Sequence, residues 1–355
     1  MSDTIPVELR AFAPSDLDQV LRLHADVFGA PAARALASRW TWSQVENLCP
    51  ENSPKWVLEA AGSVVGFLGT VPIPYRIGGR RVMTHSPSDF MVAPPYRFHG
   101  IRLLRECFRV CEFSVTTDDV AATIAVSKFL KARQAGTLRR HVKVLDARPG
   151  LSRWPSLSVL PSLLWESARA GLALRDVPSI LRSPPVAPYT GSFGPAFDRL
   201  FERCLSADPL QATVERDSRY LSWRYGSQSP QAHRVVGVSE ADGELAGYVV
   251  CCASRDEAHR GFILELVTAP GTPASLVDGL LSFAVRELRR QGAWTVRWFL
   301  LGEEEERQRA HLLRWGFRNH ELEYELLARI PTPEPARRAW RQQFGDGEQS
   351  HGCVL

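Results

Sequence analysis

The most informative segment of this 355-residue chain is Val92-Ala93-Pro94-Pro95-Tyr96-Arg97-Phe98-His99-Gly100-Ile101-Arg102. It follows an apolar strand pattern at Pro87–Val92 and precedes a helical pattern at Ile101–Cys111, so it predicts a strand-to-helix turn. The start of a helix leaves about four amide N–H groups without partners, and these suit a phosphate. Gly100 would let the backbone approach such a group, and Arg97 adds a permanent charge. We therefore expect an anionic ligand at this turn.

The turn resembles the signature of the GNAT (Gcn5-related N-acetyltransferase) superfamily, in which a strand ends in Val-x-Pro-x-x-Arg-x-x-Gly-x-Gly/Ala before a helix. The strand Val64–Gly69 is similar to the third strand of that family. The resemblance covers about residues 5–146 and, more weakly, 213–330. Arg102 departs from the pattern, because the family has Gly or Ala there, and its side chain would narrow or redirect the phosphate cradle.

The resemblance implies an acyl-CoA co-substrate, most commonly acetyl-CoA. The turn amides would hold the pyrophosphate, and the pantetheine arm would pair with the preceding strand as an added strand. The amide of Val92 would stabilise the oxyanion. The implied cofactor-binding residues are Met91, Val92, Arg97, Phe98, His99, Gly100, Ile101 and Arg102.

Amide formation from a thioester needs a neutral amine, whose proton a carboxylate or an imidazole can take. Asp89 lies beside the implied CoA-binding strand, and His85 shares its face if the strand is unbroken, although Pro87 argues against that. Glu265, on an expected strand at Ile263–Val267, is the third catalytic candidate and could face the acceptor. Each has a structural alternative: Asp89 as a strand-end hydrogen-bonding residue, His85 as a surface or pocket-lining residue, and Glu265 as a structural carboxylate.

The general acid is harder to place, because no tyrosine precedes Gly136, where the family has one. The nearest hydroxyl groups belong to Thr123 and Ser127, both weak acids. A mechanism by proximity alone stays open.

The chain is predicted to be α/β, with two tandem GNAT-like domains, each a twisted mixed sheet flanked by helices. Both halves show a hairpin, an apolar strand, a long helix, a strand, a helix ending in glycine and a final strand. The predicted parts are a CoA-binding GNAT domain at 1–147, a linker with covering helices at 148–192, a GNAT-like domain at 193–332 and a flexible tail at 333–355.

The second half is predicted to bind no CoA of its own. Its equivalent turn, Val267–Ala274, lacks the Arg-x-x-Gly pattern. Pro270 and Pro273 each remove an amide donor where a phosphate would need one.

Composition narrows the class of protein. Hydrophobic residues make up 45% and charged residues 23%, which is typical of a globular chain, and a net charge of +4 argues against a nucleic-acid ligand. Apolar runs of about 20 residues are lacking, and the N-terminal sequence does not resemble a secretory signal, so no membrane partner is expected. The seven cysteines form no C-x-x-C pair, which predicts reduced thiols in a cytoplasm and no metal site.

The leading interpretation is an acyl-CoA-dependent N-acyltransferase whose acceptor amine, on a small molecule or a peptide, attacks the thioester directly. Two alternatives stay open. The donor could be an acyl carrier protein or an aminoacyl-tRNA, or the chain could be a non-catalytic CoA-binding module. An acidic carrier protein would dock on a basic rim made of Arg102, Arg105, Arg109, Arg139, Arg140 and Lys143.

Overall fold

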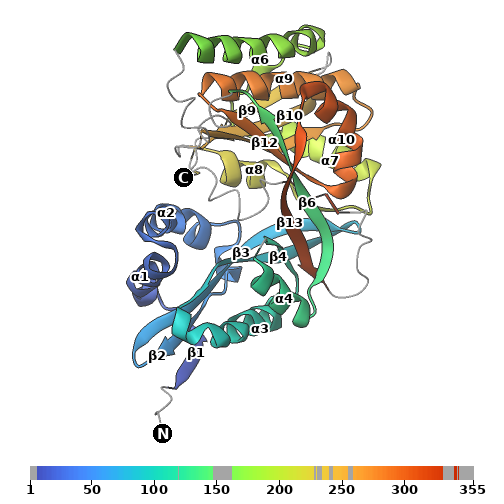
Figure 1. Cartoon of the computed structure of the whole chain (residues 1–355). Helices are drawn as coiled ribbons and strands as arrows, with labels where there is room; N and C mark the ends of the chain where they lie inside the picture. The colour runs from blue at the N-terminus through green and yellow to red at the C-terminus, as the bar shows by residue number, and fades with distance from the viewer. Residues whose placement is uncertain are drawn as a thin grey trace.

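The computed structural model describes residues 6–118, 120–146, 162–227, 229, 234–239, 243–254, 259–330, 340–341 and 343. A single mixed sheet passes through both halves of the molecule, and helices cover its faces (Figure 1). The predicted α/β class is therefore confirmed.

The first half supplies the strands and helices at the bottom of Figure 1. Its strands are β1 (Val7–Ala11), β2 (Trp56–Ala60), β3 (Ser63–Ile77), β4 (Arg80–Val92), β5 (Ser114–Asp118) and β6 (Arg133–Val144). Its α-helices are α1 (Leu17–Phe28), α2 (Ala30–Trp40), α3 (Gly100–Val110) and α4 (Ala121–Phe129). Short helical turns lie at Pro14–Asp16, Thr41–Val45, Pro50–Asn52 and Pro94–His99.

A long hairpin forms the centre of this half. Gly78 and Gly79 both have positive φ, 57° and 79°, which is the backbone that a tight two-residue hairpin turn needs. A Gly-Gly pair predicts such a turn from the sequence, between short strands at Tyr75–Ile77 and Arg80–Met83. The structure confirms the turn, but β3 and β4 extend well beyond those short strands. The prolines in these strands are accommodated within the ladder, where Pro87 lies opposite Thr70.

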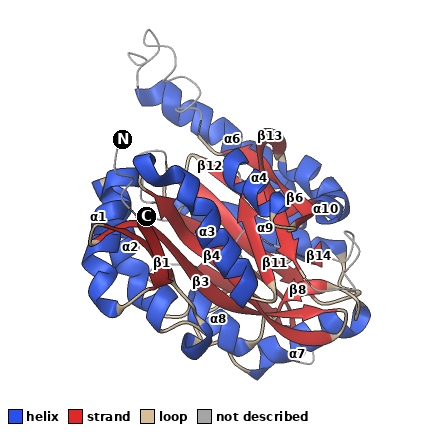
Figure 2. Ribbon diagram, turned by 90° about the horizontal axis from the view of Figure 1, so that it is seen from below, coloured by secondary structure: helices blue, strands red, loops and turns tan. Residues whose placement is uncertain are grey.

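Helices cover opposite faces of this part of the sheet. Val57 and Phe67 pack beneath α1 and α2, whereas Leu58 and Leu68 pack beneath α3. Figure 2, seen from below, shows α3 lying along β3 and β4. This alternation follows from the period of two in a strand, and it gives each face its own small core.

The second half begins with a long helix that lies on α9 (Figure 1). Its helices are α6 (Ser162–Arg182), α7 (Pro195–Ala207), α8 (Ser218–Tyr225), α9 (Ala274–Arg290) and α10 (Gly302–Trp315). Its strands are β7 (Ala187–Pro188), β8 (Ala212–Val214), β9 (Arg234–Ser239), β10 (Leu245–Ala253), β11 (Arg260–Thr268), β12 (Thr295–Leu301), β13 (Arg318–Arg329) and β14 (Trp340–Arg341). Most of the predicted tail at 333–355 lies outside the described residues.

The two halves exchange strands β6 and β13. Strand β13 of the second half pairs with β5 of the first, and β6 of the first half pairs with β12 of the second. Strands β6 and β13 also pair with each other, so the order across the centre is β5-β13-β6-β12. The sheet therefore continues across the predicted boundaries at 147 and 193.

Gly136 corrects one expected element. The sequence predicts a helix from Asp119 to Gln134 capped by this glycine, but α4 ends at Phe129 and Gly136 lies inside β6. A Cβ atom at Gly136 would lie 2.6 Å from Cδ1 of Leu301 on β12. The glycine thus serves close packing in the exchanged strands rather than a helix end.

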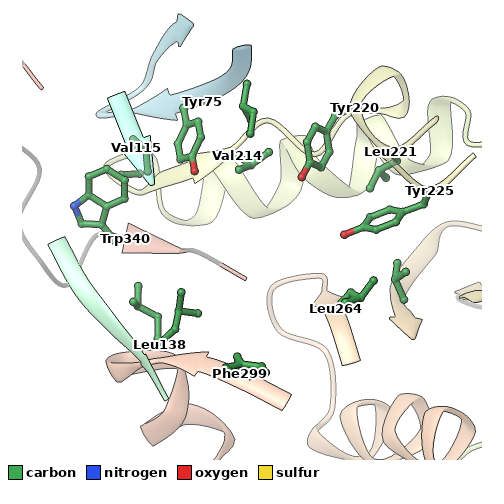
Figure 3. Close-up of a cluster of buried hydrophobic side chains, with 14 of the residues drawn as sticks. Tyr75, Val115, Leu138, Val214, Tyr220, Leu221, Tyr225, Leu264, Phe299 and Trp340 are labelled. Atoms are coloured by element: carbon green, nitrogen blue, oxygen red, sulfur yellow. The ribbon is translucent and has the colours of Figure 1, made fainter. Parts of the chain in front are cut away.

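The largest core cluster draws from both halves (Figure 3). Tyr75 of β3 meets Trp340 of β14 edge-on, with ring centroids 6.4 Å apart. Leu138 and Phe299 lie on the exchanged strand β6 and its neighbour β12, and both are buried. Because this core is shared, the halves support each other.

Candidate active site

The strands β4 and β5 separate and leave an opening in the sheet. They run parallel, and their described pairing is confined to His85 and Ser114. Beyond that pair, the edge of β4 from Ser86 to Val92 faces the gap. An exposed strand edge can hydrogen-bond an extended ligand as if it were another strand.

A β-bulge distorts β4 beside this opening. Ser88 lies opposite Gly69 and Met91 lies opposite Phe67, so Asp89 and Phe90 are both set against one residue of β3. Asp89 adopts a φ of 55°, which is uncommon for a residue other than glycine. Bulges of this kind redirect side chains and backbone groups, and they are frequent beside active sites.

A cavity of about 320 Å³ passes through the opening. Its wall combines residues from the α1 and α2 face with residues from the α3 and α4 face. Polar side chains that line the cavity include His24, Arg39, Asp89, Thr117, Thr123 and Ser127. A ligand could therefore enter from one face of the sheet and meet a second molecule on the other.

Asp89 lines this cavity, as the sequence suggests, but its carboxylate is already engaged. Oδ1 of Asp89 accepts from the guanidinium of Arg39 in a buried ion pair, while Oδ2 accepts from Ser88 Oγ at 3.0 Å and lies 3.3 Å from Nε2 of Gln44. The carboxylate of Asp89 is therefore held in place by its neighbours, as expected for a residue with a structural role at the bulge.

His85 lies on the other side of the strand from Asp89. Its Nε2 is 3.1 Å from the carbonyl oxygen of Asn52, and its ring is absent from the cavity lining. Burial opposes the protonated form of His85, but contact with Cys111 and the Asn52 carbonyl together raise its pKa. The structure therefore does not bring His85 and Asp89 together, because the positive φ of Asp89 breaks the alternation that would place them on one face.

Glu265 belongs to a second opening, between β11 and β12. These parallel strands pair from Arg260 to Ile263, and a bulge follows at Leu264. Glu265 is fully buried, where its Oε2 accepts from the hydroxyl of Tyr248 at 2.8 Å and Oε1 lies 3.6 Å from Nε of Arg216. These contacts fit a structural carboxylate rather than a group that faces the acceptor.

The second opening is filled in part by the chain itself. The side-chain amide of Gln343 accepts from the N–H of Leu266 at 2.8 Å and donates to the carbonyl of Leu266 at 3.1 Å. Those two backbone groups correspond in position to the edge of β4 that faces the first opening. An extended ligand would have to displace Gln343 to pair with Leu266.

The predicted phosphate turn forms a short 3-10 helix, Pro94–His99, directly before α3. The N–H groups of Tyr96 and Gly100 donate to Ala93 and Arg97 within it. Arg97 is exposed and Phe98 is 94% exposed, so both side chains are available to a ligand from solvent. His99 and Ile101 are half-buried at the start of α3.

Two residues of this turn have roles that the sequence did not suggest. Arg102 donates to the carbonyl oxygen of Val7 at 2.7 Å, which ties α3 to β1 rather than narrowing a phosphate cradle. A Cβ atom at Gly100 would lie 3.1 Å from Cζ of Phe90 and 3.3 Å from Cγ2 of Val92, so this glycine lets α3 pack closely on β4. Met91, on the same strand, is buried beneath α1 and α2.

The six basic residues proposed as a docking rim are largely engaged within the molecule. Lys143 is fully buried and donates to Asp176 at 2.7 Å, and Arg139 contacts Glu305 and Glu323. Arg109 pairs with its helix neighbour Glu106, while Arg140 contacts His320. A continuous basic rim made of these six residues is therefore contradicted.

His24 is the cavity residue that sequence reasoning missed. It lies on α1 at 7% exposure, and its ring centroid is 4.9 Å from that of Phe28. In the sequence it continues the helical stripe that runs from Leu17 to Phe28, so it reads as a core position. A polar residue in an apolar stripe was the one signal that could have identified it.

Within the described ranges, no group of three or more His, Cys, Asp or Glu side chains is placed to hold a metal ion. None of the helices that the structure describes combines the length and apolar composition needed to cross a membrane.

Comparisons with known proteins identify the fold. No family model matches the sequence, and no curated protein matches it. Among solved structures, a GCN5-related N-acetyltransferase from Kribbella flavida is similar over 92% of this chain and 71% of its own, with a TM-score of 0.60 and 17% identity.

Two other solved structures have a similar fold. A tandem GNAT protein from the clavulanic acid biosynthesis pathway covers 91% of this chain and 98% of its own, with a TM-score of 0.55 and 13% identity. N-myristoyltransferase from Saccharomyces cerevisiae, with bound myristoyl-CoA, covers 92% of this chain and 85% of its own, with a TM-score of 0.57 and 12% identity. The chain therefore has the tandem fold of the GCN5-related N-acetyltransferases.

Proposed function

We propose that this chain is an acyl-CoA-dependent N-acyltransferase with one acyl-CoA site, in the opening between β4 and β5. The observation that carries the proposal is the cavity that crosses the sheet beside the bulge at Asp89. The edge of β4 is suited to the amide groups of a pantetheine arm, and the cavity is suited to the thioester at its end. The amine would approach from the face covered by α1 and α2.

The phosphates would lie near the turn at Pro94–His99 and the start of α3. Arg97 is exposed there and offers a planar cation to a phosphate. Arg102 donates to the carbonyl oxygen of Val7, so the proposal assigns it to holding α3 against β1. Gly100 supports the site indirectly, because it sets the distance between α3 and β4.

The size of the cavity favours a short acyl group such as acetyl. Its volume of about 320 Å³ is at the small end of the range of about 300–1,000 Å³ that is usual for ligand pockets. The N-myristoyltransferase of similar fold holds myristoyl-CoA, so a long acyl chain is the natural alternative.

A turnover assay tests the proposal. Release of the CoA thiol would be followed with acetyl-CoA and palmitoyl-CoA, each with a panel of primary amines that includes tripeptides, spermidine and an aminoglycoside. We expect acetyl-CoA to be consumed only when an acceptor is present, and palmitoyl-CoA to be a poor donor. Binding of acetyl-CoA without transfer to any amine would support a non-catalytic CoA-binding module instead.

A further inference from the structure

His24 has the position of a residue that works on a ligand in the cavity. It projects from α1 into the space that Asp89 and Arg39 line from β4 and α2. It is more than nine-tenths buried, and its Nδ1 has no hydrogen-bond partner among the described residues. A buried polar atom without a partner is unfavourable unless a ligand or a water molecule satisfies it.

The charges around His24 favour a neutral ring. Burial lowers the pKa of His24, the nearby carboxylate of Asp89 raises it, and Arg39 lowers it, with a net lowering from the usual 6.5. Among the residues that the structure describes, Asp118 on β5 is the other charged group in the cavity wall. A neutral imidazole at neutral pH has a lone pair that can accept a proton.

We propose that His24 is the general base that takes the proton from the attacking amine. The proposal rests on the proposed function, since it names the group that acts on the amine in the same cavity. Asp89 then has a defined part: its carboxylate, held by Arg39, stabilises the imidazolium that forms. Asp89 is a positioning and electrostatic residue in this scheme, and His24 is the catalytic one.

The proton and electron balance is complete with the two substrates alone. The nitrogen lone pair forms a bond to the thioester carbon while the π pair of the carbonyl moves onto oxygen, and His24 takes one proton from that nitrogen. The oxygen pair then re-forms the carbonyl as the carbon–sulfur bond breaks and its electron pair stays on sulfur. The proton passes from the imidazolium to the thiolate. The products are an amide and free CoA, and His24 is again neutral.

The test compares His24→Gln and His24→Ala with the unchanged protein. Thiol release from acetyl-CoA would be measured with the best amine of the panel from pH 5 to 9, and acetyl-CoA binding by calorimetry. We expect kcat/KM to fall by about 10²–10⁴-fold in both variants, with binding retained and the acid limb of the pH profile lost. Added imidazole should restore part of the activity of His24→Ala.

His141→Gln is the matched control. His141 lies on β6, is 3% exposed and has a pKa that burial lowers, but it lies outside the cavity. This variant should keep both the rate and the pH profile of the unchanged protein.

The outcomes separate the two proposals. Unchanged turnover in His24→Gln would overturn the role of His24 and leave the proposed function standing. Loss of acetyl-CoA binding together with the activity in that variant would do the same. A parent protein that does not bind acetyl-CoA would overturn the proposed function together with it.

Discussion

Arg39 and Asp89 form a buried ion pair at the bulge of β4, where the sheet opens. The side chain of Asp89 is 1% exposed and that of Arg39 is 10% exposed, so neither charge is well solvated. Ser88 and Gln44 also contact the carboxylate. The pair joins α2 to the strand that the proposal assigns to acyl-CoA, so its integrity affects both stability and activity.

Removing one partner of this pair should be costly. Arg39→Met leaves the carboxylate of Asp89 buried without its cation, and loss of one partner of a buried pair typically costs about 3–5 kcal/mol. Urea unfolding would measure the change. Arg109→Met removes an exposed pair with Glu106 and should change stability far less, because solvent screens such a pair. Equal effects in the two variants would contradict the buried pair.

Gly100→Ala should loosen the packing of α3 on β4. The added methyl group would meet Phe90 and Val92 at distances shorter than ordinary contact, so we expect a loss of about 1–3 kcal/mol and weaker acetyl-CoA binding. Gly171→Ala, in α6, meets no atom within 4 Å and should stabilise the protein by about 0.5–1 kcal/mol. Thermal unfolding of both variants would show opposite shifts. A larger substitution such as Gly100→Glu would disturb this packing as well as any phosphate.

His24 should make the protein less stable in mild acid. Its pKa is lowered in the folded state, so the unfolded chain binds more protons, and stability falls as the pH drops below about 6.5. The lowered pKa of His141 changes the pH dependence of stability in the same direction, and the raised pKa of His85 changes it in the opposite direction. A variant of His24 is therefore needed to isolate its contribution. From pH 7.5 to pH 5, the urea midpoint of the parent protein should fall relative to that of His24→Gln. A difference that is constant with pH would contradict a lowered pKa.

Gln343 should keep the second opening closed to an extended ligand. Because its amide occupies both backbone groups of Leu266, we expect acetyl-CoA to bind with a stoichiometry of one per chain. Gln343→Ala should leave that stoichiometry and the affinity unchanged, since the first opening lies elsewhere. Two equivalent sites in a calorimetric titration of the parent protein would contradict the single-site account.

The sequence predicts local elements well and long-range pairings poorly. The strand, turn and helix around Pro94 follow from local pattern, and the hairpin at Gly78-Gly79 follows from turn chemistry. The exchange of β6 and β13 could not be predicted, because Gly136 satisfies a helix-end pattern as well as a close strand contact. The site shows the same division: Asp89 was identified from its place beside the turn, whereas its bond to Arg39 joins residues 50 positions apart.

The bulge also explains why His85 and Asp89 do not lie together. A regular strand would set His85 and Asp89 on one face, and the positive φ of Asp89 removes that relation. His24 comes from a different helix, so only the packed structure shows that it shares a cavity with Asp89.

Calorimetric titration of acetyl-CoA into variants of α4 tests whether acyl-CoA binds in the opening between β4 and β5. Thr123 lines the cavity, whereas Ala122, its neighbour on the same helix, is exposed. Thr123→Trp should abolish binding because the indole fills the opening between β4 and β5, and Ala122→Trp should bind as the parent protein does. Unchanged acetyl-CoA affinity in a folded Thr123→Trp variant would contradict the assignment of this opening as the acyl-CoA site.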